Sequence, residues 1–227
     1  MYGRAAELYR RSLLFPVEKP ESMILYNIAL AYSGMNDFEN EIKYLVLSSE
    51  KEENEPRVFE HLGVLYYNLG LIEKAGDTLK KAVEIGSRSP EAAKILEHIN
   101  NMGNANLYEI AMVRLTEMLA KGERLSHNEY RKAKFIAKFL LENSYKTGII
   151  YRNMGVFHFQ TKNYKEAIGY FEKSRNETNS AEMWVFEAYT YYTMGETEKA
   201  LEVLERGIVL FPRDAGLLDL RSRIKGE

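Results

Sequence analysis

Four histidines are the residues best suited to bind a metal or to transfer a proton, but their spacing favours neither chemistry. They are His61, His98, His127 and His158. No two of them stand four residues apart beside a carboxylate, which is the spacing of a helical zinc site. His61 and His158 lie within apolar helical patterns, where a packing role is the simpler interpretation. The histidines therefore predict no metal site.

The acidic run Glu-Lys-Glu-Glu-Asn-Glu at residues 50–55 is the other candidate for a cation site. It lacks the alternating oxygen ligands and central glycine of a calcium loop, so a solvated turn is favoured. The absence of cysteine excludes thiolate zinc sites, iron–sulfur clusters and cysteine nucleophiles. Neither a phosphate-binding glycine loop nor a Gly-x-Ser-x-Gly motif occurs. We expect no enzymatic activity, no cofactor and no bound metal.

Composition narrows the possible partners. Of the 227 residues, 45% are hydrophobic and 28% charged, which is typical of a folded, soluble protein. The 31 Lys and Arg residues nearly balance the 33 Asp and Glu residues, whereas nucleic-acid-binding proteins usually carry a basic excess, so no nucleic-acid partner is expected. The sequence has no uninterrupted apolar run of about 18 residues, so it predicts no membrane span. The N-terminus lacks the apolar segment of a signal peptide. A cytoplasmic location is favoured. A periplasmic location would require that a signal segment had been removed.

Apolar residues recur every three or four positions along most of the chain, the spacing of amphipathic helices. Ile28, Ala31, Tyr32 and Met35 illustrate this spacing. All five prolines fall between such runs, where proline begins or ends a helix without breaking it. Asp214 is expected to cap a short final helix. An all-α fold is therefore predicted.

One helical pattern occurs four times, with the first two copies 34 residues apart and the last two copies 33 residues apart. Each copy has a large side chain four residues before a small residue. The large residues are Leu25, Phe59, Tyr151 and Trp184, and the small ones are Ala29, Gly63, Gly155 and Ala188. Twelve residues after the small residue stand Glu41, Ala75, Ala167 and Ala200, followed four residues later by Leu45, Leu79, Phe171 and Leu204.

This pattern resembles the tetratricopeptide repeat (TPR), a 34-residue hairpin of two helices. The copy at residues 59–79 matches best, and residues 2–9 read as half a copy, which predicts that the natural protein extends upstream of Met1. The resemblance implies a TPR-type right-handed solenoid of helical hairpins with a divergent central segment. In such a solenoid, small residues lie where two helices cross closely, and each hairpin buries its apolar face against its neighbours.

Three positions depart from the pattern. Glu41 occupies a small position, where it should loosen the helix crossing or move its carboxylate to the edge. Replacing Glu41 by alanine is accordingly expected to be neutral or stabilising. Glu187 stands where leucine is expected, and His158 stands where tyrosine is expected.

The repeats lose register between the second and third full copies. The predicted domains are an N-terminal TPR array, a divergent helical hairpin or connector, and a C-terminal TPR array with a capping helix. They span residues 1–101, 102–147 and 148–227, respectively.

Helices are predicted at 90–101, 105–121 and 128–143, with a hinge at 100–104. Two pairings remain open. Either the first of these helices caps the N-terminal array and the other two form a divergent hairpin, or the first two form the hairpin and the third is an extra helix.

The resemblance also implies a binding surface, because in this family the first helices of the hairpins line a concave groove. The predicted partner-binding residues are Tyr26, Leu30, Val64, Tyr67, Arg152, Val156, Phe159, Tyr189 and Tyr192. Their mostly apolar and aromatic character suits a peptide or helix held by buried anchors. The alternative is that some of them pack against the central helices. Recognition of acidic chaperone tails is not expected, because only Arg152 and Asn153 retain the basic and amide character of that subtype.

Charge is distributed unevenly along the chain. Residues 36–60 carry eight acids and three bases, whereas residues 121–146 carry seven bases and three acids. Arg131, Lys134 and Lys138 share one helix face and form a secondary candidate site, the basic face. It could meet an anionic partner or the acidic half of a neighbouring chain, or it could simply be solvated.

The leading functional hypothesis is a non-enzymatic scaffold that binds a protein or peptide partner in the groove. One alternative is a structural solenoid that self-associates into a homo-oligomer. Another is an accessory repeat module of a larger enzyme or membrane-associated complex.

Overall fold

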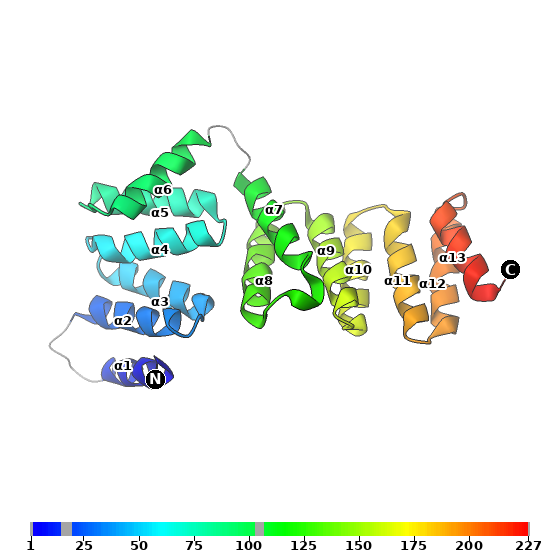
Figure 1. The fold of residues 1–227 in the computed structure, drawn as a ribbon, viewed down its shortest axis with the longest axis horizontal. Helices are drawn as coiled ribbons and strands as arrows, with labels where there is room; N and C mark the ends of the chain where they lie inside the picture. Colours follow the sequence, from blue (N-terminus) through cyan, green and yellow to red (C-terminus); the bar gives the residue numbers. More distant parts are fainter. Residues whose placement is uncertain (1, 15–19, 103–106, 227) are drawn as a thin grey trace. The chain divides into compact units, whose positions relative to one another are not determined.

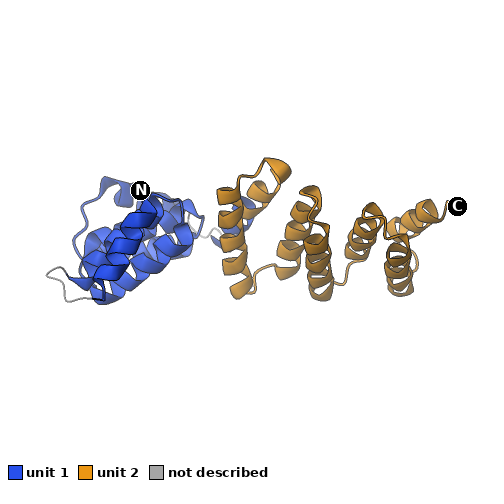
Figure 2. Cartoon of the chain, turned by 90° about the horizontal axis from the view of Figure 1, so that it is seen from below, with its two compact units in different colours: residues 1–114 blue, residues 115–227 orange. Residues whose placement is uncertain are grey.

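The computed structural model describes residues 2–14, 20–102 and 107–226 (Figure 1). These residues form thirteen α-helices and one 3-10 helix, with no strand among them. They fall into two compact units, residues 1–114 and 115–227 (Figure 2). The predicted all-α fold is confirmed.

Unit 1 contains two helical hairpins, α2/α3 and α4/α5, with one further helix packed against each. Helix α1 contacts α2, and helix α6 contacts α4 and α5. The helices are α1 (Tyr2–Ser12), α2 (Glu21–Ser33), α3 (Phe38–Lys51), α4 (Pro56–Asn68), α5 (Ile72–Glu84) and α6 (Pro90–Asn101). Helix α7 (Leu107–Leu119) begins in unit 1 and ends in unit 2.

Unit 2 repeats this order of elements. Helix α8 contacts α9, the hairpins α9/α10 and α11/α12 follow, and α13 packs against α11 and α12. The elements are η1 (Gly122–Arg124), α8 (His127–Glu142), α9 (Thr147–Gln160), α10 (Tyr164–Glu177), α11 (Ala181–Thr193), α12 (Thr197–Leu210) and α13 (Ala215–Lys225). Asp214 caps α13 by accepting a hydrogen bond from the Leu217 amide at 3.0 Å, as predicted.

Small residues of the repeat pattern lie where the two helices of a hairpin cross. A Cβ atom on Gly63 would stand 2.5 Å from Leu79 Cγ, and one on Gly155 would stand 2.5 Å from Phe171 Cε1. A side chain at either position would therefore push the two helices apart. Ala29 is fully buried at the equivalent position of α2. The prediction of paired helices that cross closely at these small residues is confirmed.

The three helices predicted between the arrays are present as α6, α7 and α8, and their ends differ from the prediction by at most two residues. Residues 103 and 104 of the predicted hinge lie outside the described residues. The contacts of α6 with α4 and α5 favour the account in which residues 90–101 cap the first array. The three-part division of the chain stays a prediction.

Glu41 is buried, so the expected move of its carboxylate to the edge is wrong. Glu41 is 5% exposed, and its Oε1 lies 2.7 Å from Nε2 of His61 on α4. Because a buried carboxylate is costly without a partner, the imidazole explains how an acid can occupy this small position. The pair also joins the first hairpin of unit 1 to the second.

Glu187 is the second buried acid at a departing position. It is 3% exposed and accepts a hydrogen bond from the Arg175 guanidinium, which comes from the preceding hairpin. Burial raises the pKa of Glu187 to about 7, although the nearby Arg175 acts to lower it. The guanidinium carbon of Arg175 also lies 3.9 Å from the centre of the Trp184 ring. Arg175 thus covers both an acid and an aromatic ring of α11.

Candidate interaction surfaces

In unit 1 the first helices of the two hairpins lie side by side and present the predicted groove residues. The ring centres of Tyr26 on α2 and His61 on α4 are 5.9 Å apart, with the rings nearly perpendicular. Leu30 is 42% exposed, and the other three predicted residues are half-buried. We name the set of Tyr26, Leu30, Val64 and Tyr67 the α2–α4 surface.

Tyr67 also contacts a neighbouring helix. Its ring meets His98 of α6 edge-on, with the ring centres 6.0 Å apart. The Arg114 guanidinium donates to the carbonyl oxygens of Tyr67 and Asn68, at 3.1 and 2.7 Å. Those carbonyls end helix α4, where a cation is favourable. Tyr67 therefore contributes to packing as well as to the accessible surface, as the alternative interpretation expects for some of the set.

A pocket of about 180 Å³ adjoins the α2–α4 surface, between the start of α2, the end of α3 and the start of α4. Met23, Tyr26 and Val58 provide its apolar lining, and Glu52 and Glu55 provide acidic groups. Burial raises the pKa of Tyr26, so its phenol is uncharged at neutral pH. The pocket combines an apolar wall with negative charge.

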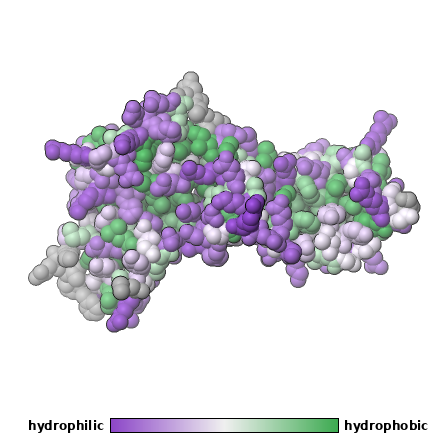
Figure 3. All heavy atoms as spheres, viewed as in Figure 1, coloured by the Kyte–Doolittle hydropathy of each residue, from purple (hydrophilic) through white to green (hydrophobic). Residues whose placement is uncertain are grey.

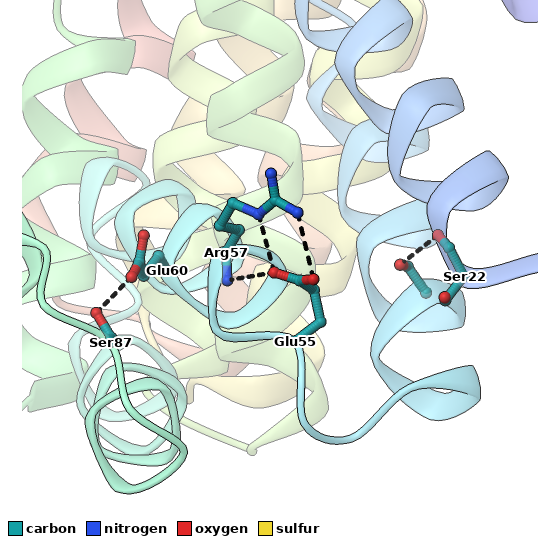
Figure 4. A network of polar contacts seen from close by, with 6 residues as sticks. Ser22, Glu55, Arg57, Glu60 and Ser87 are labelled. Carbon is teal, nitrogen blue, oxygen red and sulfur yellow. Dashed lines mark hydrogen bonds and ion pairs between the residues drawn. The ribbon is translucent and has the colours of Figure 1, made fainter. Parts of the chain in front are cut away.

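Hydrogen bonds hold the polar groups around this pocket (Figure 4). Arg57 Nε donates to Glu55 Oε1 at 2.9 Å, and Arg57 Nη2 lies 3.3 Å from Oε2. These bonds lower the pKa of Glu55, so its carboxylate is ionised at neutral pH. One turn further along α4, Glu60 accepts a hydrogen bond from Ser87.

In unit 2 the first helices of the hairpins are again neighbours. Arg152 Nη1 on α9 lies 3.5 Å from Glu182 Oε2 on α11, and the ring centres of Phe159 and Tyr189 are 5.6 Å apart. Tyr189 and Tyr192 are 46% and 44% exposed. We name the set of Arg152, Val156, Phe159, Tyr189 and Tyr192 the α9–α11 surface. On the face shown in Figure 3, hydrophobic residues are interspersed with polar ones over each unit.

A pocket of about 270 Å³ includes part of the α9–α11 surface. Arg152 and Val156 line it together with Asn153, Thr116 and Phe186. Asn153 Nδ2 donates to Thr116 Oγ1 at 3.2 Å, which ties α9 to the end of α7. Sequence reasoning missed Thr116 and Phe186. Thr116 could not be assigned to a position of the repeat, because the repeat register is broken in the central helices. Phe186 is not one of the residues that define the repeat pattern, so nothing in the sequence marked it as part of a site.

The basic face lies on α8. Lys134 and Lys138 are exposed, and Arg131 is half-buried. Lys138 Nζ is 3.8 Å from Glu142 Oε1, and Lys134 Nζ is 5.8 Å from the centre of the Tyr130 ring. Both lysine ammonium groups remain accessible to a partner.

His158 lies among aromatic rings rather than at a reactive site. It is 7% exposed, its Nε2 is 2.8 Å from Tyr130 Oη, and its ring stacks on Tyr170. Burial lowers the pKa of His158 and raises that of Tyr130 to about 12, so both groups are uncharged at neutral pH. This arrangement favours the packing role.

Within the described part of the chain, no group of three or more histidine, aspartate or glutamate side chains is placed to hold a metal ion. None of the helices described has both the length and the apolar character of a membrane-spanning segment.

Comparison with solved structures gives low similarities. The TPR2AB-domain:pHSP90 complex of yeast Sti1 shares 17% identity and a TM-score of 0.41, over 99% of this chain and 90% of that one. YrrB, described as a TPR protein with an unusual peptide-binding site, shares 18% identity and a TM-score of 0.38, over 96% and 100%. A tetratricopeptide repeat protein from Parabacteroides merdae shares 15% identity and a TM-score of 0.41, over 99% and 92%. No curated protein matches the sequence.

The family comparison matches three of the four hairpins. The model of the tetratricopeptide repeat matches residues 24–48, 56–85 and 181–214. These segments contain most of α2/α3, α4/α5 and α11/α12, whereas α9/α10 lies outside them. The matched segments occur in both units, so each unit contains at least one segment that is similar to the tetratricopeptide repeat.

Proposed function

We propose that the chain is a non-enzymatic protein–protein interaction scaffold, and that its first helices bind a peptide or helix of a partner. Tetratricopeptide repeats support the role of a scaffold. The α9–α11 surface supports the finer proposal most strongly, because Tyr189 and Tyr192 are exposed, the half-buried Phe159 contacts Tyr189, and a pocket includes Arg152 and Val156 of the same surface.

The chemistry of this surface suits an extended or helical peptide. Aromatic side chains bury a large area at a low cost in conformational entropy, and they often carry most of the binding free energy of an interface. Arg152 and Glu182 place one charge of each sign beside the pocket, and their exposed ion pair contributes little by itself. A partner with an apolar anchor and nearby polar groups could therefore be held without a large rearrangement.

Binding of peptides from a random library to the intact chain tests this proposal. For peptides selected on the wild type, Phe159→Ala and Tyr189→Ala should each weaken binding by about 1–3 kcal/mol. Leu210→Ala is a matched control, because Leu210 is 59% exposed at the end of α12 and outside the surface. Tyr189→Ala should leave the melting temperature close to that of the wild type because Tyr189 is exposed, whereas Phe159→Ala should lower it modestly because Phe159 also packs against the core residues Phe171 and Met183.

Two results would contradict the proposal. One is that both aromatic variants bind the selected peptides as tightly as the Leu210→Ala control does. The other is that both variants unfold, which would assign Phe159 and Tyr189 to the core of the hairpins.

A further inference from the structure

The end of α3 and the loop that follows it carry acids that have no basic partner among the residues that the structure describes. Glu50, Glu52 and Glu53 are exposed, and none of them forms an ion pair with another described residue. Lys51, which lies among them, is paired with Glu21 at 3.0 Å. Three like charges this close repel one another, so a cation brought to this place from another molecule would be favourable.

The pocket beside these acids can accept the stem of a lysine. Glu52 lies at the pocket together with Met23, Tyr26 and Val58. Lysine side chains pack their methylene groups on apolar surface while the ammonium group stays at a polar edge. The pocket therefore offers both an apolar wall for the stem and a carboxylate for the charge.

The same chain carries exposed cations on α8. Lys134 and Lys138 are one helical turn apart, so their side chains point to one side and lie about 5–6 Å apart at Cβ. Both are exposed, and the 3.8 Å contact of Lys138 with Glu142 is between two largely solvated groups. Such a pair exchanges readily for a better-placed carboxylate.

We propose that the acidic end of α3 in one molecule binds the basic face of α8 in a second copy of this chain. One chain supplies both charged surfaces, because residues 36–60 carry five more acids than bases and residues 121–146 carry four more bases than acids. The contact joins two different surfaces, so repeated copies form a ring if the rotation between them closes and an open filament if it does not. It uses the outside of α8 and the α3–α4 loop, and it is independent of peptide binding on the α9–α11 surface.

Charge exchange between two variants tests the contact. The first variant, Lys134→Glu with Lys138→Glu, has a reversed basic face, and the second, Glu52→Lys with Glu53→Lys, has a reversed acidic face. Sedimentation over a wide range of protein concentration should show self-association of the wild type that weakens as ionic strength rises. Each variant alone should associate at least tenfold more weakly. An equimolar mixture of the two should associate again, because each then meets a surface of opposite charge.

Matched controls separate this contact from a general effect of net charge. Lys80→Glu with Lys94→Glu changes the net charge equally at exposed lysines of α5 and α6, and it should leave self-association unchanged. A wild type that stays monomeric at every concentration and at low salt would overturn the proposal. It would equally be overturned by a mixture that remains monomeric, or by a control that weakens association as much as the first variant. Peptide binding by the two charge variants should match the wild type, so that failure here leaves the function proposed for the α9–α11 surface untouched.

Discussion

The first hairpins of the two units, α2/α3 and α9/α10, are closed by the same hydrogen bond. Ser48 Oγ donates to the Ser22 carbonyl oxygen, and Ser174 Oγ donates to the Gly148 carbonyl oxygen, both at 2.8 Å. Each partner of the first bond is 126 residues before its counterpart in the second. The geometry of the crossing is therefore retained where the side chains around it differ.

One position of these hairpins has opposite chemistry in the two units. Glu41 of α3 is buried against His61, whereas Ala167, its counterpart in α10, is buried among Phe171, Met183 and Phe186. The comparison shows that this position holds either a carboxyl side chain or a methyl group, each with a matching partner on the next hairpin. Contacts between hairpins, rather than within them, decide which residue is tolerated.

Moving the acid into unit 2 should have the largest effect. Ala167→Glu places a carboxylate in an apolar cluster without a cation, and we expect it to lower the free energy of unfolding by about 3–5 kcal/mol. Urea denaturation of the intact chain measures this loss. Adding Phe186→His should recover part of it, because Phe186 stands two residues before the small residue of α11, as His61 does in α4.

Two outcomes would break the comparison. If Ala167→Glu is as stable as the wild type, the position does not need a partner on the next hairpin. If Phe186→His gives no recovery in the double variant, the two units do not share the register that we infer from the repeat pattern.

Removing the acid from unit 1 should have a smaller effect of the same origin. Glu41→Ala leaves His61 without its partner, and we expect a loss of about 1–3 kcal/mol in the free energy of unfolding. This replaces the neutral or stabilising effect expected from the repeat pattern. Hydrogen exchange should locate the loss in α3 and α4. Glu50→Ala, a change at an exposed acid of the same helix, is the control and should be nearly neutral. Equal stability of Glu41→Ala and Glu50→Ala would mean that the buried pair contributes nothing.

These two positions also show how far the sequence predicts the structure. Apolar spacing predicted the helices, and the small residues Gly63 and Gly155 predicted the close crossings, because both signals lie within one hairpin. The partners of Glu41 and Glu187 could not be predicted, because they come from the adjacent hairpin and depend on its exact placement. The same limit applies to Thr116, whose helix follows a break in the repeat register.

The two units should also differ in their response to pH. Glu187 has a pKa of about 7 in the folded chain and an ordinary value of 4.5. Between these values the folded chain holds a proton that the unfolded chain has released, so the contribution of Glu187 to stability falls as pH rises from about 4.5 to about 7. Glu187→Gln removes this titration, and its stability relative to the wild type should rise by about 1–3 kcal/mol between pH 5 and pH 8. Denaturation curves of both proteins at several pH values give the difference. A difference that is constant with pH, or that falls, would show that Arg175 keeps Glu187 ionised throughout.

The smallest expected effect tests what the two hairpins share. Ser48 and Ser174 are buried, and each donates to a carbonyl oxygen at the start of the preceding helix. Replacing either serine by alanine removes one hydrogen bond and leaves that carbonyl without the hydroxyl, which should lower the free energy of unfolding by about 1 kcal/mol. Because the two bonds have the same length and burial, Ser48→Ala and Ser174→Ala should cost nearly the same, and the double variant should show the sum of the two losses. Hydrogen exchange in α2 and α9 assigns each loss to its own unit. Clearly unequal losses would mean that Glu41 or the aromatic stack around His158 changes the strength of the hydrogen bond. The two hairpins would then share a backbone geometry but not its energetics.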